Sequence, residues 1–161
     1  MYAAVKAPPT NGNRRKSGNG SRKRMAMDAE HWDRLGALHT RVEQELARAL
    51  QKHHSIGLSE YRALSRLAEA DDGELRMQEL ADLIGLNQSS VSRLASRLET
   101  SGLTRRDLCP DDRRGVYSVI TEEGREVQKK ARPTYDGALR EALDAAAADG
   151  HLGPLVESLR S

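Results

Sequence analysis

The sequence predicts a mainly α fold with a small β wing (α+β), that is, a winged helix-turn-helix flanked by N- and C-terminal helices. Three observations support this class. Ala81, Gly85 and Val91 have the spacing of a helix-turn-helix. Two short β patterns follow them, separated by a segment suited to a tight turn that ends at Gly115. Apolar residues recur at helical spacing both before and after these features.

Length and composition indicate one folded domain. The chain has 161 residues, of which 37% are hydrophobic and 31% are charged, and it contains no phenylalanine. Its core must therefore consist mainly of leucine, alanine and valine. No apolar run approaches the roughly 20 residues that span a bilayer, and no signal-peptide pattern is present. We expect a cytoplasmic protein without a membrane partner.

Residues 1–27 predict a disordered basic tail, which leaves residues 28–161 for the folded domain. The tail is rich in Pro, Gly, Asn and Ser, and it holds seven Lys or Arg and no acid. The rest of the chain carries 19 basic against 24 acidic residues. One interpretation of the tail is a flexible arm that follows DNA phosphates. The others are that translation starts at Met25 or Met27, or that the tail was added for expression.

Two helices are predicted before the helix-turn-helix. Residues 28–56 show apolar side chains at steps of three and four, and Gly57 ends the pattern. Ser59 is a good N-cap for the next helix, which stops near Asp72 and Gly73. Residues 77–84 then form the first, positioning helix of the helix-turn-helix.

The helix-turn-helix spacing has a physical interpretation. Ala81 leaves room for two crossing helices, Gly85 provides the turn, and Val91 is the apolar plug between them. Asn87 is a plausible N-cap for the second helix, whose first turn would meet base edges. The candidate DNA-binding side chains of this helix are Asn87, Gln88, Ser89, Ser90, Ser92, Arg93 and Arg97.

The arginines of this helix have two interpretations. Arg93 and Arg97, spaced i and i+4, would point the same way and suit phosphate oxygens or a guanine edge. Alternatively, Arg97 with Glu99 nearby forms an ordinary solvated face. The segment from Gln88 to Gly115 carries six arginines against four acids, which concentrates positive charge near the predicted interface.

The hairpin follows at once. Residues 103–109 and 116–121 alternate apolar and polar side chains, and β-branched residues cluster in the second segment. Residues 110–115 supply the turn between the two strands.

At this hairpin the chain resembles a known family. Asp112-Arg-Arg-Gly-Val116, followed by Ile120 and Thr121, is similar to the wing signature of the MarR family of bacterial transcription regulators. The order of elements across residues 28–160 also resembles that family. Ser118 and Ile120 depart from the pattern, which usually has valine and leucine there, so only the packing of the wing is affected.

The resemblance implies a homodimer that binds a pseudo-palindromic site on double-stranded DNA. One recognition helix per half-site would enter the major groove, and Arg114, with Arg113 beside it, would reach the adjacent minor groove. The alternative for Arg114 is an internal ion pair with Asp112. Residues 58–121 would form the DNA-binding lobe, and residues 28–56 and 122–161 the dimerisation helices.

The C-terminal region fits this arrangement. Thr121 is predicted to cap a long helix, in which Pro133 should produce a kink or a division. A last short helix follows, with Leu152, Leu155, Val156 and Leu159. These helices carry more apolar surface than a small lobe covers, which favours a partner subunit.

The family also implies a repressor that is released by a small aromatic or phenolic effector, which binds between the lobe and the dimer platform. We place Trp32, His39 and Tyr61 near that pocket, although each is also explained as a core or interface residue. An alternative sensor is Cys109, the single cysteine, whose neighbouring arginines would favour its thiolate. A zinc sensor built from the five histidines lacks ligand spacing.

No catalytic motif is evident, so we expect a protein that is not an enzyme and uses no cofactor or metal. The second class to consider is a weakly specific architectural DNA-binding protein. The ratio of specific to non-specific affinity separates it from a regulator.

Overall fold

The computed structural model describes residues 18–108 and 116–161. In chain order its elements are α1 (Gly18–His54), α2 (Leu58–Glu69), β1 (Glu74–Arg76), α3 (Met77–Ile84), α4 (Gln88–Thr100), β2 (Thr104–Leu108), β3 (Val116–Ile120), α5 (Glu122–Ala147) and α6 (Gly153–Arg160). The predicted class, mainly α with a small β wing, is confirmed.

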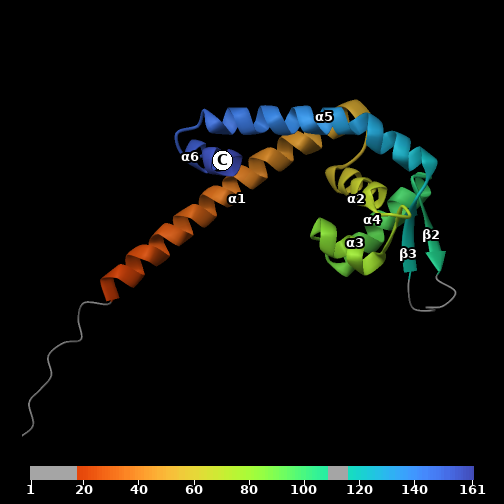
Figure 1. Ribbon diagram of the computed structural model, residues 1–161, viewed down its shortest axis with the longest axis horizontal. Coiled ribbons are helices and arrows are strands. Elements are labelled where there is room, and N and C mark those ends of the chain that lie inside the picture. Colours follow the sequence, from red (N-terminus) through yellow and green to blue (C-terminus); the bar gives the residue numbers. More distant parts are fainter. Residues whose placement is uncertain (1–17, 109–115) are drawn as a thin grey trace, which may run out of the picture.

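The helices form two groups. The long helices α1 and α5 run side by side with α6 at one end, and we call these three the platform (Figure 1). Helices α2, α3 and α4 and the sheet lie below the platform, and we call them the lobe (Figure 1). Within the described residues no helix is both long and apolar enough to cross a membrane.

The lobe is held by a core of leucines from all three of its helices. Leu64 and Leu67 of α2, Leu80 of α3, and Leu94 and Leu98 of α4 are each at most 1% exposed. Each fully buried leucine contributes roughly 1.5–3 kcal/mol relative to an exposed one. This shared core fixes the orientation of α4 relative to α2 and α3.

The sheet has three antiparallel strands in the order β1-β3-β2. Thr104 pairs with Ile120 and Leu75 with Ser118, so the predicted hairpin strands are present. Strand β1 was not predicted, because its three residues are too few to show alternation. It joins the start of α3 to the base of the wing.

The platform has its own packing and a joint with the lobe. Leu38 of α1 packs with Ala146 of α5 and Val156 of α6. A separate cluster, formed by Leu50, Ile56, Tyr61 and Ala131, connects α1, α2 and α5 where the lobe meets the platform. Two apolar clusters thus hold the platform together and attach the lobe to it.

Helix α1 begins at Gly18, earlier than the predicted start at residue 28, so the predicted disorder of residues 1–27 is wrong for residues 18–27. The low apolar content of this stretch argued that it cannot be buried, and residues 21–27 are indeed exposed. Helix formation needs no burial here, because Arg, Lys, Met and Ala have high helix propensity and extend a helix that is already nucleated.

Pro133 does not divide the C-terminal helix, since α5 continues through it. Figure 1 shows the first turns of α5, in teal, at an angle to the rest of the helix. A proline removes one backbone hydrogen bond and crowds the preceding turn, which favours a bend, while packing on both sides of Pro133 maintains the helix.

Candidate nucleic-acid interface

The turn between α3 and α4 has the geometry that its sequence predicts. Gly85 ends α3 in the left-handed region, with φ of 69°. Ala81 is 1% exposed and Val91 is fully buried. The Asn87 side chain caps α4 by accepting a hydrogen bond from the Ser90 backbone N–H at 2.8 Å. These contacts fix where the first turn of α4 begins.

Helix α4 has a buried face and a polar face. Val91, Leu94, Ala95 and Leu98 face the core. Gln88, Ser89 and Arg93 are exposed, whereas Ser90 and Ser92 are half-buried. The Arg93 Nε donates to the Ser89 carbonyl at 3.3 Å, and the Ser92 hydroxyl donates to the Gln88 carbonyl at 2.8 Å. The polar side chains at the start of α4 thus lie on a rigid support.

Arg97 differs from this group because it has a partner in another helix. Its Nε lies 3.2 Å from Oε1 of Glu60 in α2. The other carboxylate oxygen of Glu60 accepts the Gly57 backbone N–H at 2.8 Å, at the start of α2. The sequence interpretation considered Glu99 as the acid near Arg97, but Glu99 pairs with Arg106 at 3.1 Å. Arg97 therefore holds α4 to α2 in this structure.

The tip of the wing lies outside the described residues. Arg113, Arg114 and Cys109, which the sequence marks as candidate minor-groove and redox residues, belong to that segment. The base of the wing is described, and there Arg105 pairs with Asp107 at 2.9 Å.

Two further arginines near α4 were not singled out from the sequence. Arg106 of β2 donates to the Ser96 hydroxyl at 2.7 Å, and Arg76, which precedes α3, donates to the Tyr117 hydroxyl at 2.7 Å. Arg106 was counted only toward the general charge, and Arg76 lies on the strand that was not predicted. The sequence signal that could have identified Arg76 is a basic residue directly before the positioning helix.

A cleft of about 440 Å³ separates the lobe from the platform. His39 and Tyr61 both line it, together with Tyr135 and Arg132 of α5. The rings of Tyr61 and Tyr135 stack with centroids 4.7 Å apart. Trp32, the third predicted pocket residue, lies elsewhere and is 73% exposed on the N-terminal half of α1. The structure thus brings together two of the three.

The environment of the Tyr61 hydroxyl raises its pKa. Burial raises its pKa above the ordinary value, a hydrogen bond with Ser65 lowers it in part, and the charge of Asp136 raises it again. Tyr61 is therefore a neutral hydroxyl in the cleft over an extended pH range, able to donate a hydrogen bond.

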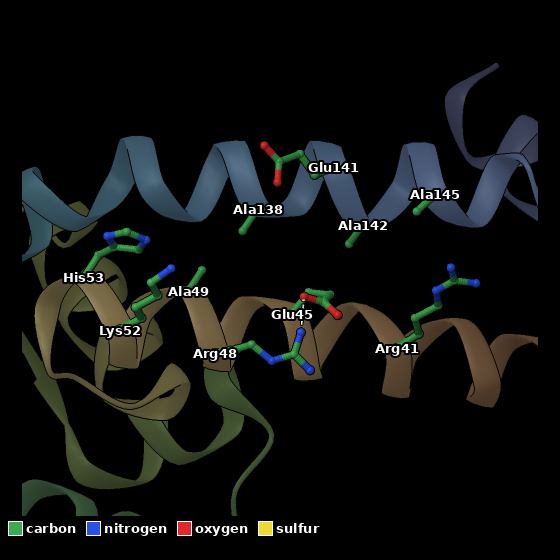
Figure 2. A pocket seen from close by; sticks show the side chains of 10 residues that line it. All are labelled: Arg41, Glu45, Arg48, Ala49, Lys52, His53, Ala138, Glu141, Ala142 and Ala145. Atoms are coloured by element: carbon green, nitrogen blue, oxygen red, sulfur yellow. Dashed lines mark hydrogen bonds and ion pairs between the residues drawn. The ribbon is translucent and has the colours of Figure 1, made fainter.

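A second groove, of about 370 Å³, lies within the platform between α1 and α5. Figure 2 shows its small side chains, Ala49 on α1 and Ala138, Ala142 and Ala145 on α5, with charged groups around them. Arg48 and Glu45 form an ion pair at its edge, at 2.6 Å. Among residues 18–108 and 116–161, no three His, Cys, Asp or Glu side chains are grouped so as to hold a metal ion.

A helix-turn-helix on a shared leucine core, followed by a hairpin that completes a three-stranded sheet, defines a winged-helix protein. A sequence model of the MarR family matches residues 54–115. The structure is similar to Sco3205, a MarR family transcriptional regulator from Streptomyces coelicolor in complex with DNA. Sequence identity is 33%, the match covers 80% of this chain and 81% of Sco3205, and the TM-score is 0.68. The chain belongs to the MarR family of DNA-binding transcription regulators.

Other solved structures have the same fold. AbsC, a MarR family regulator from Streptomyces coelicolor, is 28% identical over 81% of this chain and 92% of its own, with a TM-score of 0.65. CouR from Rhodococcus jostii RHA1, bound to p-coumaroyl-CoA, is 24% identical over 78% of this chain and 83% of its own, with a TM-score of 0.62. The latter likeness is one of fold alone. No match was found among curated proteins.

Proposed function

We propose that this protein is a homodimeric repressor that binds a pseudo-palindromic operator, with α4 of each subunit in the major groove. The observation that carries the proposal is the first turn of α4. Its exposed Gln88 and Ser89 are uncharged and hydrogen-bonding, the groups that distinguish base edges. The buried opposite face and the Asn87 cap hold this turn rigid. In the proposal Arg114, with Arg113, enters the adjacent minor groove.

The homodimer is supported by apolar side chains that one subunit leaves uncovered. Trp32 is 73% exposed and Leu35 is 41% exposed on α1, and Leu159 is 61% exposed on α6. All three belong to the platform. Burial of such groups against a second platform would stabilise a dimer and set the distance between the two copies of α4.

The test of specific binding is enrichment of genomic DNA fragments by the purified protein at moderate salt, followed by titration of the best fragment against a scrambled duplex. A regulator should enrich a pseudo-palindrome and prefer it by at least about 10³ over scrambled DNA. An architectural protein would give diffuse enrichment and a ratio near one, and that result would reject the proposal.

Single substitutions test whether α4 and the wing bind the operator. Arg93→Ala and Arg114→Ala should weaken operator binding while the sedimentation of the protein stays the same. Arg140→Ala is the matched control, because Arg140 is exposed on α5, away from α4. Equal affinities of all three variants and the parent protein would remove α4 and the wing from the mechanism.

We further propose that a small aromatic effector binds the cleft that contains His39 and Tyr61. The Tyr61 and Tyr135 rings form an aromatic wall, and Arg132 supplies positive charge for a carboxylate or phenolate. A panel of phenols and aromatic carboxylates should raise the melting temperature of the protein and lower operator affinity. By linkage, operator DNA must lower the affinity for the same compound by the same factor. A compound that binds with no reciprocal effect is not the effector.

A further inference from the structure

A pocket of about 290 Å³ lies where the start of α3, the first turns of α4 and the base of the wing meet. Arg76 and Gln78 line it from the start of α3, Gln88 and Ser92 from α4, and Arg106 and Val116 from the wing. Three separate elements thus surround one small space beside the polar face of α4.

The chemistry of this lining selects an anion. Arg76 and Arg106 each carry a permanent positive charge, and among the described lining residues none is acidic. The amide of Gln78 adds an uncharged hydrogen-bond donor. Guanidinium groups match tetrahedral oxyanions because their N–H donors are arranged in a rigid fork.

The Arg76 side chain is held in place by the wing. Its Nε donates to the Tyr117 hydroxyl at 2.7 Å, and its guanidinium carbon lies 5.4 Å from the centre of the Tyr117 ring. The two residues are also paired across β1 and β3. Such contacts reduce the entropy that a long side chain loses when it binds a ligand.

The Arg106 side chain is held by the recognition helix. It donates to Ser96 at 2.7 Å and pairs with Glu99 at 3.1 Å, so Arg106 joins β2 to α4. Glu99 offsets part of the Arg106 charge. Arg76 lines the same pocket from the start of α3. An anion between the two arginines would connect the start of α3 to the wing and α4.

We propose that this pocket binds a backbone phosphate of the operator, with Arg76 as the principal contact and Arg106 as the second. The inference rests on the proposed DNA binding and adds a phosphate site outside α4 and the wing tip. A phosphate at this site adds affinity that is independent of sequence, and it fixes the register in which Gln88 and Ser89 meet the bases.

The test measures how operator affinity depends on salt. For B-DNA the slope of log K against log salt concentration changes by about 0.9 for each phosphate contact. Arg76→Gln should therefore make the slope shallower by about 1.8 for a dimer, with the same change on scrambled DNA. Arg140→Gln, which removes one exposed arginine from α5, should leave the slope unchanged.

A second measurement locates the phosphate. In a set of operator duplexes, each phosphate in turn is replaced by a neutral methylphosphonate. The parent protein should lose affinity at each phosphate that it contacts, and at one symmetric pair of these positions Arg76→Gln should show no further loss. Arg106→Lys, which keeps the charge but removes the fork, should show an intermediate loss there.

The outcomes separate this inference from the proposed function. If the parent protein prefers its operator but Arg76→Gln keeps the full salt slope and the same methylphosphonate sensitivity, the phosphate site is wrong and the regulator stands. If the parent protein does not distinguish operator from scrambled DNA, the specific regulator fails. The effect of Arg76→Gln on the salt slope still decides the phosphate site in that case.

Discussion

Gly124, in the first turn of α5, lies directly against the turn that follows α4. A Cβ built at this position would overlap the carbonyl oxygen of Leu103 and come within 2.9 Å of Ile120 Cγ1. The Leu103 carbonyl also accepts the Thr121 backbone N–H at 3.1 Å, so it cannot turn away without losing that bond. We therefore expect Gly124→Ala to push α5 away from the lobe.

The expected change in the free energy of unfolding of Gly124→Ala is the sum of two opposing effects. Overpacking of a tight contact costs about 1–3 kcal/mol, and a fixed backbone neighbour places Gly124→Ala at the upper end of that range. Alanine is favoured over glycine within a helix by roughly 0.5–1 kcal/mol. The net expectation is a loss of about 2 kcal/mol in the free energy of unfolding.

Urea denaturation at one fixed protein concentration measures this loss, because stability of a self-associating protein depends on concentration. Gly137→Ala in the same helix is the control. Apart from its chain neighbours and the adjacent backbone of its own helix, no described heavy atom lies within 4 Å of a Cβ at Gly137, so that variant should gain roughly 0.5–1 kcal/mol. If Gly124→Ala is as stable as Gly137→Ala, the contact with Leu103 does not constrain α5, and the reasoning fails.

Three further predictions concern the cap, the platform and the cleft. Asn87→Ala should lower the free energy of unfolding, measured by urea titration, by about 1 kcal/mol, whereas Asn87→Asp should retain most of the parent stability. Equal losses in the two variants would contradict the role of Asn87 as a cap. Trp32→Ser should move the sedimentation equilibrium toward monomer with little change in helical circular dichroism; an unchanged equilibrium would exclude Trp32 from the dimer contact. Burial raises the pKa of Tyr61, so the stability that its hydroxyl contributes is complete below pH 10.0 and is lost as the pH rises through the higher pKa of the folded state. Tyr61→Phe should remove that part of the dependence of unfolding free energy on pH. An identical pH dependence in the variant and the parent protein would refute this prediction.

Local signals were sufficient for much of the lobe. The bounds of α3, the Asn87 cap, the Gly85 turn and both hairpin strands follow from side chains within a few residues of each feature. These features depend on backbone geometry and on hydrogen bonds between near neighbours. A single sequence contains that information.

The parts that were missed depend on contacts between distant residues or on a competing propensity. Glu60 and Arg97 are 37 residues apart, and Arg76 and Tyr117 are 41 apart, so no spacing rule brings either pair together. The early start of α1 was missed because the absence of burial was taken as the absence of a helix. Trp32 belongs to the apolar pattern of α1, but this part of α1 lies beyond the core of the subunit, so the Trp32 side chain is exposed.

The Glu60 carboxylate makes two contacts, one with each oxygen. One oxygen accepts the Gly57 backbone N–H at the start of α2, and the other pairs with Arg97 of α4. A rotation of α2 about Gly57 must therefore carry α4 with it or break one of these two bonds. The Glu60 side chain thus links the N-cap of α2 to α4, and the orientation of α4 is coupled to the bend between α1 and α2.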